Sequence, residues 1–245
     1  MAERAVMKGG IIAAGAGSRL RQAGWTVPKP LVEVAGLPLI GRVIRNFRAA
    51  GITSLVIIFN EEERDCESWV RSQYPDLDLR VLVKTTASSL ESFREVCALL
   101  GSGPALISTV DAWCPEEEFV AFVKAVRQYP PDATVLAVTP LVADERPLWV
   151  AMNPDGRITC IGGDSGSLVT AGMYAVPERV RRLSSVSGLG RLREFLSRLV
   201  AEGEQVYGAV IPNVVDVDRA EDVALAEVMA RKEAGTAVKP QGVVK

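Results

Sequence analysis

"GGIIAAGAGSRLRQAGWTVPKPLVEV", residues 9–34, is the stretch that decides the fold. It begins as an apolar strand and then breaks into glycines, an arginine, and a lysine between two prolines. Gly15 and Gly17 fall at the carboxyl end of the strand, which is where an open parallel sheet places its ligands. Glycine permits positive φ and close approach of the backbone, so the turn can offer its N–H groups to an anion.

The side chains that follow this turn are suited to phosphate. Ser18 adds a hydroxyl, and Arg19 adds a planar fork that matches phosphate oxygens. Lys29 is a point charge in a segment that Pro28 and Pro30 keep extended and stiff. Together these residues predict a cradle for a triphosphate.

Outward from this stretch, apolar runs alternate with amphipathic stretches. The runs predict strands at residues 9–14, 54–60, 79–85, 105–110 and 133–139, with helices at 39–50, 66–74, 90–100 and 119–129. Such alternation is typical of an α/β fold, a mostly parallel sheet with helices on both faces. Shorter strands come next, then a helical pair at about 177–202 and a last helix at about 219–232. We expect one domain over residues 1–232 and a flexible tail over residues 233–245.

Composition limits the partners. The 245 residues are 48% hydrophobic with a formal net charge of -2, so nothing predicts binding to nucleic acid or to an anionic membrane. The sequence has no histidine, and its four cysteines are scattered, which argues against a zinc site. No apolar run is long enough to span a bilayer, and the first residues lack a signal-peptide pattern. We therefore expect a cytoplasmic protein with reduced thiols.

Two common phosphate motifs do not fit the glycine turn. A Walker loop needs Gly-Lys-Ser or Gly-Lys-Thr, whereas Gly17 is followed by Ser18 and Arg19. The dinucleotide fingerprint needs a third glycine, where this chain has Leu20. It also needs a ribose-binding acid about 20 residues after the glycines, whereas the second strand ends in Asn60, far beyond that distance.

The turn and the lysine segment resemble a longer signature. Residues 13–20, Ala-Ala-Gly-Ala-Gly-Ser-Arg-Leu, and residues 28–31, Pro-Lys-Pro-Leu, resemble the motifs of nucleotidyltransferases that make nucleotide sugars and related compounds. The molybdopterin-type (MobA-like) NTP transferases share that fold. The resemblance implies a Rossmann-like domain with a nucleotide-binding half at about 9–139 and an acceptor-binding half at about 140–232. It assigns catalytic roles to Arg19 and Lys29, and nucleotide binding to Ala13, Ala14, Gly15, Gly17 and Ser18.

The resemblance also implies magnesium held by two acids, Asp111 after the strand at 105–110 and Asp216 in Val-Asp-Val-Asp at 215–218. Asp111 could instead cap the next helix, but Pro115 is expected as its first residue, which puts the cap at Cys114. Asp218 has the spacing of a helix N-cap, with an acid three residues on, so we expect it to be structural.

Base and acceptor recognition are less tightly defined. Thr86, Ser88 and Ser89 resemble the segment that meets the base and ribose, but Ser88 with Glu91 also forms a capping box, and the two roles are compatible. The acceptor-phosphate lysine that many relatives carry in Glu-Lys-Pro has no counterpart in residues 161–166. The candidates to replace its charge are Arg146, Arg157 and the Ser165 loop.

The predicted function is transfer of a nucleoside monophosphate from an NTP to a phosphorylated acceptor, with release of pyrophosphate. The acceptor would be a sugar 1-phosphate or a phosphorylated alcohol. The alternatives are a molybdopterin-type nucleotidyltransferase and a nucleotide-binding regulator without turnover. The oligomeric state is left open, with a homodimer among the alternatives.

Overall fold

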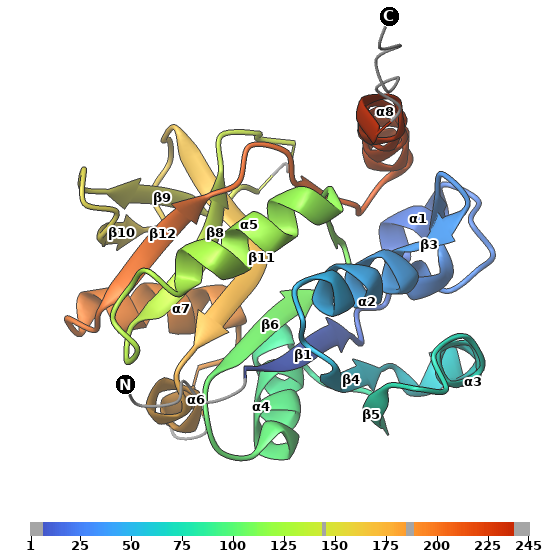
Figure 1. The fold of residues 1–245 in the computed structure, drawn as a ribbon, viewed down its shortest axis with the longest axis horizontal. Helices are drawn as coiled ribbons and strands as arrows, with labels where there is room; N and C mark the ends of the chain where they lie inside the picture. Colours follow the sequence, from blue (N-terminus) through green and yellow to red (C-terminus); the bar gives the residue numbers. More distant parts are fainter. Residues whose placement is uncertain (1–6, 144–145, 185–188, 238–245) are drawn as a thin grey trace, which may run out of the picture.

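The computed structural model describes residues 7–143, 146–184 and 189–237, and a nine-stranded sheet runs through them. Its order is β10-β9-β11-β6-β1-β4-β5, and β8 and β12 continue it from β11 (Figure 1). The strands are β1 (Lys8–Ala13), β4 (Ser54–Phe59), β5 (Asp78–Val83), β6 (Ala105–Thr109), β8 (Thr134–Thr139), β9 (Trp149–Met152), β10 (Ile158–Ile161), β11 (Leu168–Val176) and β12 (Val206–Val210). Two short pairs lie outside this sheet: β2 (Glu33–Val34) with β3 (Leu37–Pro38), and β7 (Ala112–Trp113) with β13 (Val215–Asp216).

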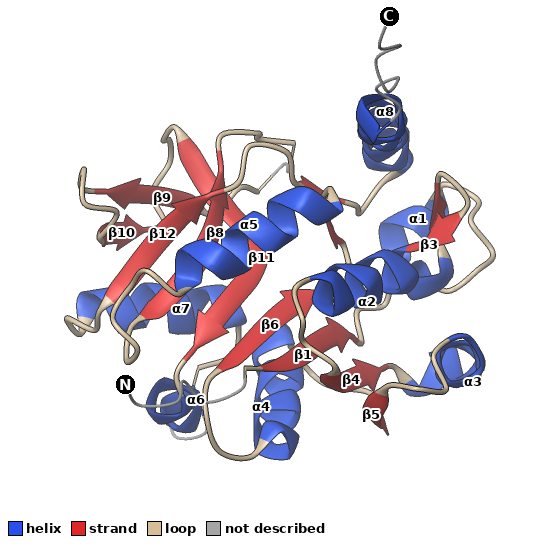
Figure 2. Cartoon of the chain, in the orientation of Figure 1, coloured by secondary structure: helices blue, strands red, loops and turns tan. Residues whose placement is uncertain are grey.

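Helices cover both faces of the sheet (Figures 1 and 2). One face carries α2 (Leu39–Ala49) and α5 (Glu116–Val126), and the other carries α4 (Ser89–Leu100) and α7 (Leu192–Ala201). Their buried side chains form two apolar cores, one on each side of the sheet. The remaining helices are α1 (Ser18–Gln22), α3 (Arg64–Gln73), α6 (Glu178–Ser184) and α8 (Ala220–Ala237), with 3-10 turns η1 (Lys29–Leu31) and η2 (Glu61–Glu63). The predicted α/β architecture is confirmed.

Strand direction divides the sheet into two parts. In the first part, β1 pairs in parallel with β4 and with β6, and β4 pairs in parallel with β5. The carboxyl ends of these four strands therefore lie along one edge, the usual position for a ligand site. In the second part, β11 runs antiparallel to β6, β8 and β9. The change of direction at β11 lies beside the strand that leads to Asp111.

The first two glycines of the opening stretch let helices pack closely on both sides of β1. A Cβ on Gly9 would lie 2.3 Å from Leu55 Cδ2 and 2.9 Å from the ring of Phe47 in α2. A Cβ on Gly10 would lie 2.6 Å from Val96 Cγ1 in α4. Since side chains at these positions would overlap their neighbours, glycine is needed for the three-layer packing.

The last helix is longer than the sequence predicts. It was expected to end near Lys232, but α8 continues to Ala237. Glu233 accounts for part of the extension because its carboxylate contacts Arg42 of α2 at 3.2 Å and accepts a hydrogen bond of 3.1 Å from the Glu116 backbone N–H. These contacts tie α8 to α2 and to the start of α5. No helix in the described ranges has the combination of length and apolar character needed to cross a membrane.

Candidate active site

The glycine turn and the lysine segment are in direct contact at the carboxyl end of β1. Gly17 adopts φ 59, in the left-handed region, and a Cβ there would lie 2.9 Å from the Lys29 Cβ. A Cβ on Gly15 would meet nothing within 4 Å, so the backbone at that position is open to a bound group. Ala13 ends β1, Ala14 is buried after it, and Ser18 begins α1. The predicted nucleotide-binding turn therefore has the close packing and the open face that the motif requires.

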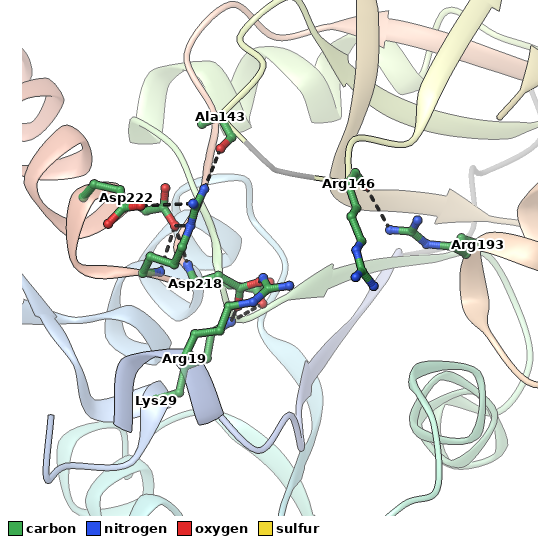
Figure 3. Close-up of polar contacts among 10 residues, drawn as sticks. Arg19, Lys29, Ala143, Arg146, Arg193, Asp218 and Asp222 are labelled. Carbon is green, nitrogen blue, oxygen red and sulfur yellow. Dashed lines mark hydrogen bonds and ion pairs between the residues drawn. The ribbon is translucent and has the colours of Figure 1, made fainter. Parts of the chain in front are cut away.

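Lys29 is buried and joins two parts of the chain that are far apart in sequence. Its Nζ donates to Asp111 Oδ2 at 2.6 Å and to Asp218 Oδ1. Arg19 Nη1 donates to the other oxygen of Asp218 at 2.7 Å, so this carboxylate holds both cations (Figure 3). The two predicted catalytic cations thus lie together, and both are paired with carboxylates.

The charges in this cluster fix its protonation state. Burial alone would lower the pKa of Lys29, but Asp111, Asp218 and Asp216 outweigh it and raise that pKa above its ordinary value. Burial likewise opposes ionisation of Asp111, yet the ammonium of Lys29 and its hydrogen bond hold the pKa of that carboxyl below its usual range. The pair is therefore an ammonium and a carboxylate at neutral pH.

Asp111 and Asp216 meet at one wall of a cavity of about 260 Å³. Asp216 lies in β13, directly opposite Ala112 of β7, and the Val217 N–H donates to the Asp111 carbonyl at 3.0 Å. Burial, followed by the charges of Asp216 and Asp111, raises the pKa of Tyr174, which lines the same cavity. The two predicted metal acids are therefore neighbours, although they are far apart in the sequence.

The side chains of Asp111 and Asp216 are suited to binding a hard cation. Both offer only carboxylate oxygens, the donors that Mg²⁺ prefers. Within the described ranges, no cluster of three or more His, Cys, Asp or Glu residues is arranged to enclose a metal. Magnesium usually needs no such cage, because it binds one or two carboxylates and completes its shell with water and substrate phosphates. The donor set of Asp111 and Asp216 therefore fits that ion.

The expectation that Asp218 caps the last helix is wrong. The carboxylate of Asp222 accepts hydrogen bonds from the backbone N–H groups of Asp218, at 3.1 Å, and Arg219, at 2.8 Å. Asp222 therefore satisfies the start of α8 from within its first turn, and the Asp218 side chain is left to bind Arg19 and Lys29. The helix after Asp111 also begins one residue later than expected, with Pro115 at the N-cap and Glu116 first.

The predicted base-binding residues lie in the loop after β5 and at the start of α4, and they have structural partners. Ser88 caps α4 by accepting a hydrogen bond from the Glu91 N–H at 3.2 Å, as the capping box predicted. The Thr86 hydroxyl pairs with Ser92 at 2.7 Å. The Ser89 hydroxyl accepts from the Leu192 N–H at 3.3 Å and lines the cavity. The capping role is confirmed, and base binding by these three residues stays a prediction.

Residues of β11 and α7 form a large part of the cavity wall. Gly172 has φ +68, and a Cβ there would lie 2.6 Å from the Thr109 hydroxyl oxygen, so only glycine fits this wall. Arg193 lines the cavity, and its guanidinium donates to the Arg146 carbonyl at 3.3 Å (Figure 3). Arg157, by contrast, forms a bridge with Tyr207 and is not among the cavity residues. The Ser165 loop does not line the cavity either.

Three residues of the site were given no functional role by the sequence. Asn60 directly follows β4, and there its amide donates to the Ala14 carbonyl at 3.4 Å and its oxygen accepts from Thr85. A polar side chain at the carboxyl end of a buried strand was the signal for this residue. Arg193 is one of several arginines in its segment and carried no signal, while the spacing of Asp218 favoured a different role.

Comparison with known proteins identifies the family of the chain. The MobA-like NTP transferase domain family matches residues 9–203, and the chain belongs to this family. The resemblance found in the sequence is therefore confirmed.

Two curated proteins show the range of similar sequences. A mannose-1-phosphate guanyltransferase from Gibberella zeae is 34% identical over 128 residues, which are 49% of this chain and 35% of that protein. A CMP-5'-(3-aminopropyl)phosphonate synthase from Streptomyces rubellomurinus is 26% identical over 211 residues, 80% of this chain and 32% of that protein. The chain thus spans about a third of the length of each of these relatives.

Among solved structures, an inositol-1-phosphate CTP transferase from T. maritima matches with a TM-score of 0.79 and 22% identity. The match covers 95% of this chain and 99% of that one. It establishes that the fold is shared and confirms the predicted fold class.

Proposed function

We propose that the protein transfers a nucleoside monophosphate from an NTP to a phosphorylated small molecule and releases pyrophosphate. The observation that carries this proposal is the position of Asp111. Its carboxylate bonds to Lys29 of the phosphate cradle and also lines the cavity with Asp216. A triphosphate at the glycine turn and an acceptor in the cavity would therefore meet at the two carboxylates.

In this proposal, the β1 turn binds the triphosphate through its backbone N–H groups, with the hydroxyl of Ser18 beside them. Arg19 and Lys29 release Asp218 and pair with the phosphate oxygens, because phosphate offers them the same charge-assisted hydrogen bonds. The cations then lie where negative charge develops on the transferred and leaving groups, and this lowers the barrier electrostatically. Thr86, Ser88 and Ser89 are the proposed contacts to the base and ribose.

Asp111 and Asp216 are the proposed ligands of Mg²⁺. When bound, the ion would neutralise charge on the phosphates and help to align them. The chain's own contribution is to hold Asp111, directly before β7, next to Asp216 of the paired strand β13 and beside the cation cluster. Substrate phosphates would complete the coordination shell.

The acceptor needs no protein base. A phosphomonoester has a second pKa of about 6, so it is mostly a dianion at neutral pH and can attack the α-phosphorus directly. This agrees with a chain that contains no histidine. Arg193 is the proposed anchor for the acceptor phosphate, with Arg146 as its neighbour, in place of the absent lysine. Of the residues that could replace the charge of that lysine, Arg157 is set aside because it does not line the cavity.

The walls of the cavity restrict the acceptor to a compact molecule. Apart from Arg193 and the two aspartates, its described lining consists of aliphatic groups and a few hydroxyls. They include Leu141, Leu148, Val169, Leu192, Leu196, Thr139, Thr170 and Tyr174. The hydroxyls, the two carboxylates and Arg193 also offer polar partners, so both a sugar 1-phosphate and a phosphorylated alcohol stay candidate acceptors.

The test is pyrophosphate release from each of the four common NTPs with a panel of phosphorylated acceptors. The panel should pair inositol 1-phosphate and mannose 1-phosphate with phosphorylated short-chain alcohols and an alkyl phosphonate. We expect release that depends on both substrates, stops with excess chelator and returns with magnesium. Binding of NTP without turnover for every acceptor would instead support the regulator alternative.

We also propose that the reaction takes place in the cytoplasm. The four cysteines form no disulfide, and Cys66, Cys97 and Cys114 are buried, as expected for a reducing compartment. Fractionation of the cells that make the protein would test this placement.

A further inference from the structure

Glu63 is a buried carboxylate next to the phosphate cradle that the proposed reaction leaves unused. It ends the η2 turn after β4, and its side chain is only 3% exposed. Neither carboxylate oxygen has a hydrogen-bond partner within the part of the chain that the structure describes. A buried carboxylate in this condition is costly, so its place beside a functional segment calls for a reason.

Arg21 connects Glu63 to the glycine turn. Its Nη2 lies 3.9 Å from Glu63 Oε1, and the same nitrogen donates to the carbonyl of Ala16, between the two glycines of the turn. Glu63 also faces the backbone N–H of Lys29. Through Arg21 the carboxylate is linked to the turn that would surround the triphosphate, and it also lies beside the segment that carries the lysine.

The charges around Glu63 place its ionisation close to neutrality. Burial raises the pKa of Glu63 to about 7, with Glu62 adding to the effect, while Arg21 and Lys29 oppose it. Cys66 of α3 also faces this carboxylate, but burial raises the pKa of that thiol to about 12, so it stays neutral. Only the ionised carboxylate attracts Arg21 fully, and hence the strength of this contact depends on pH.

We propose that Glu63 is a positioning residue that acts through Arg21: its ionised form draws the guanidinium inward and holds the glycine turn in the shape that binds the triphosphate. The inference rests on the proposed function, since it treats the turn as the NTP site. Protonation of Glu63 releases Arg21 and loosens the turn. The buried charge would lower the free energy of unfolding, but it would keep the cradle ordered.

This role has a signature that an ordinary structural residue lacks. The folded-state pKa of about 7 lies above the value of about 4.3 in an unfolded chain, so the folded protein binds the proton more tightly. The free energy of unfolding therefore falls as the pH rises from about 4.3 to about 7. Glu63→Gln removes this penalty, and we expect it to be more stable than the wild type at pH 8, by a margin that shrinks toward pH 5.

Activity should change in the opposite direction. At pH 8 we expect Glu63→Gln to lower kcat/KM for the NTP about ten-fold, the scale of one hydrogen bond to a charged group. The ratio of wild-type to variant kcat/KM should approach one at pH 6, where wild-type Glu63 is mostly protonated. Titration of the substrates affects both proteins equally and cancels in this ratio. In an Arg21→Met background, Glu63→Gln should have no further effect, because the two residues act as one unit.

Glu62 supplies a matched control. It lies 3.5 Å from the same guanidinium but is 73% exposed, so at pH 8, where Glu63 is ionised in either protein, Glu62→Gln should change neither melting temperature nor kcat/KM. The proposal fails if Glu63→Gln melts lower than the wild type at pH 8, keeps full activity, or shows a ratio that does not vary with pH. If the wild type has no transferase activity, the proposed function fails. The same variants then test Glu63 through NTP affinity and through melting temperature against pH.

Discussion

The site has two regions. The first, along the carboxyl edge of β1, β4, β5 and β6, is formed by charged side chains, whereas the second, the cavity beside β8 and β11, is lined mainly by aliphatic side chains and hydroxyls. In the first region, the cations Arg19 and Lys29 are neutralised by Asp111 and Asp218. In the second region, Arg193 is the one cationic side chain among the described residues that line the cavity. Asp111 and Asp216 stand at the boundary between the regions.

Under the proposed function, this difference would let the protein recognise its two substrates in different ways. Every NTP carries the same triphosphate, so the first region can rely on charges and backbone N–H groups at fixed positions. Acceptors differ in the body attached to the phosphate, so the second region must select by shape and by hydroxyl contacts. Substitutions in the first region should therefore impair turnover with all acceptors, and substitutions in the second should change which acceptor is used.

The largest loss of turnover is expected for a substitution of Asp216, at the boundary between the two regions. Asp216→Asn should reduce turnover to background with every acceptor, because it removes a charge that the proposed cation needs. Asp216 is exposed, so the melting temperature should change little. Turnover and Mn²⁺ affinity, measured side by side, check this prediction. Normal turnover in a variant that still binds Mn²⁺ would remove Asp216 from the site.

Lys29→Ala tests the charged region. Turnover should fall by two or more orders of magnitude, on the scale of about 2.7 kcal/mol for one lost transition-state contact. The substitution also leaves two carboxylates without their buried cation, so stability should fall by about 3 kcal/mol. Kinetics at a temperature where the variant is folded, together with denaturant unfolding, separate the two losses.

A second lysine serves as the control for that experiment. Lys84 also bridges two carboxylates, Glu91 at 3.2 Å and Glu95 at 2.5 Å, but its side chain is 40% exposed. Lys84→Ala should therefore leave turnover unchanged and lower stability far less than Lys29→Ala does. Equal losses in the two lysine variants would mean that Lys29 is only a structural ion pair.

The first, charged region was more predictable from the sequence than the second region, the cavity, for physical reasons. The turn around Gly15 and Gly17 is local: a strand, a break and a cation within a few residues define it. The position of Asp111 was equally readable, since it follows an apolar strand directly. In contrast, Arg193 reaches the cavity only because α7 packs against β10 and α4, and no local pattern of residues records that packing.

Asp218 shows a second limit. Its spacing fits a helix N-cap, and the opening of α8 offers more than one acid that could satisfy the first turn. The choice is made by Arg19, 199 residues earlier in the chain, and by Lys29, which draw the Asp218 carboxylate away. Local capping rules state what a side chain can do, whereas distant charges decide what it does.

The proposed acceptor binding in the cavity can be tested through Arg193. Arg193→Gln should raise KM for the acceptor about ten-fold, the scale of one lost hydrogen bond to a charged group, and leave KM for the NTP unchanged. Arg157→Gln is the control, because Arg157 does not line the cavity and should leave both constants as they are. A rise in KM for the NTP alone would show that Arg193 belongs to the charged region.

The smallest effect separates Asp222 from Asp218, which lie four residues apart at the start of α8. Asp222 is buried and accepts from two backbone N–H groups, so Asp222→Ala should cost about 1 kcal/mol of stability, as for a lost cap. Turnover should change little, since Asp222 touches neither Arg19 nor Lys29. Asp218→Asn keeps the size of the side chain but weakens its hold on both cations, so turnover should fall while the melting temperature changes less. Melting temperature and turnover for the two variants decide the matter. If Asp222→Ala loses activity without losing stability, the acid that serves the cradle has been assigned to the wrong residue.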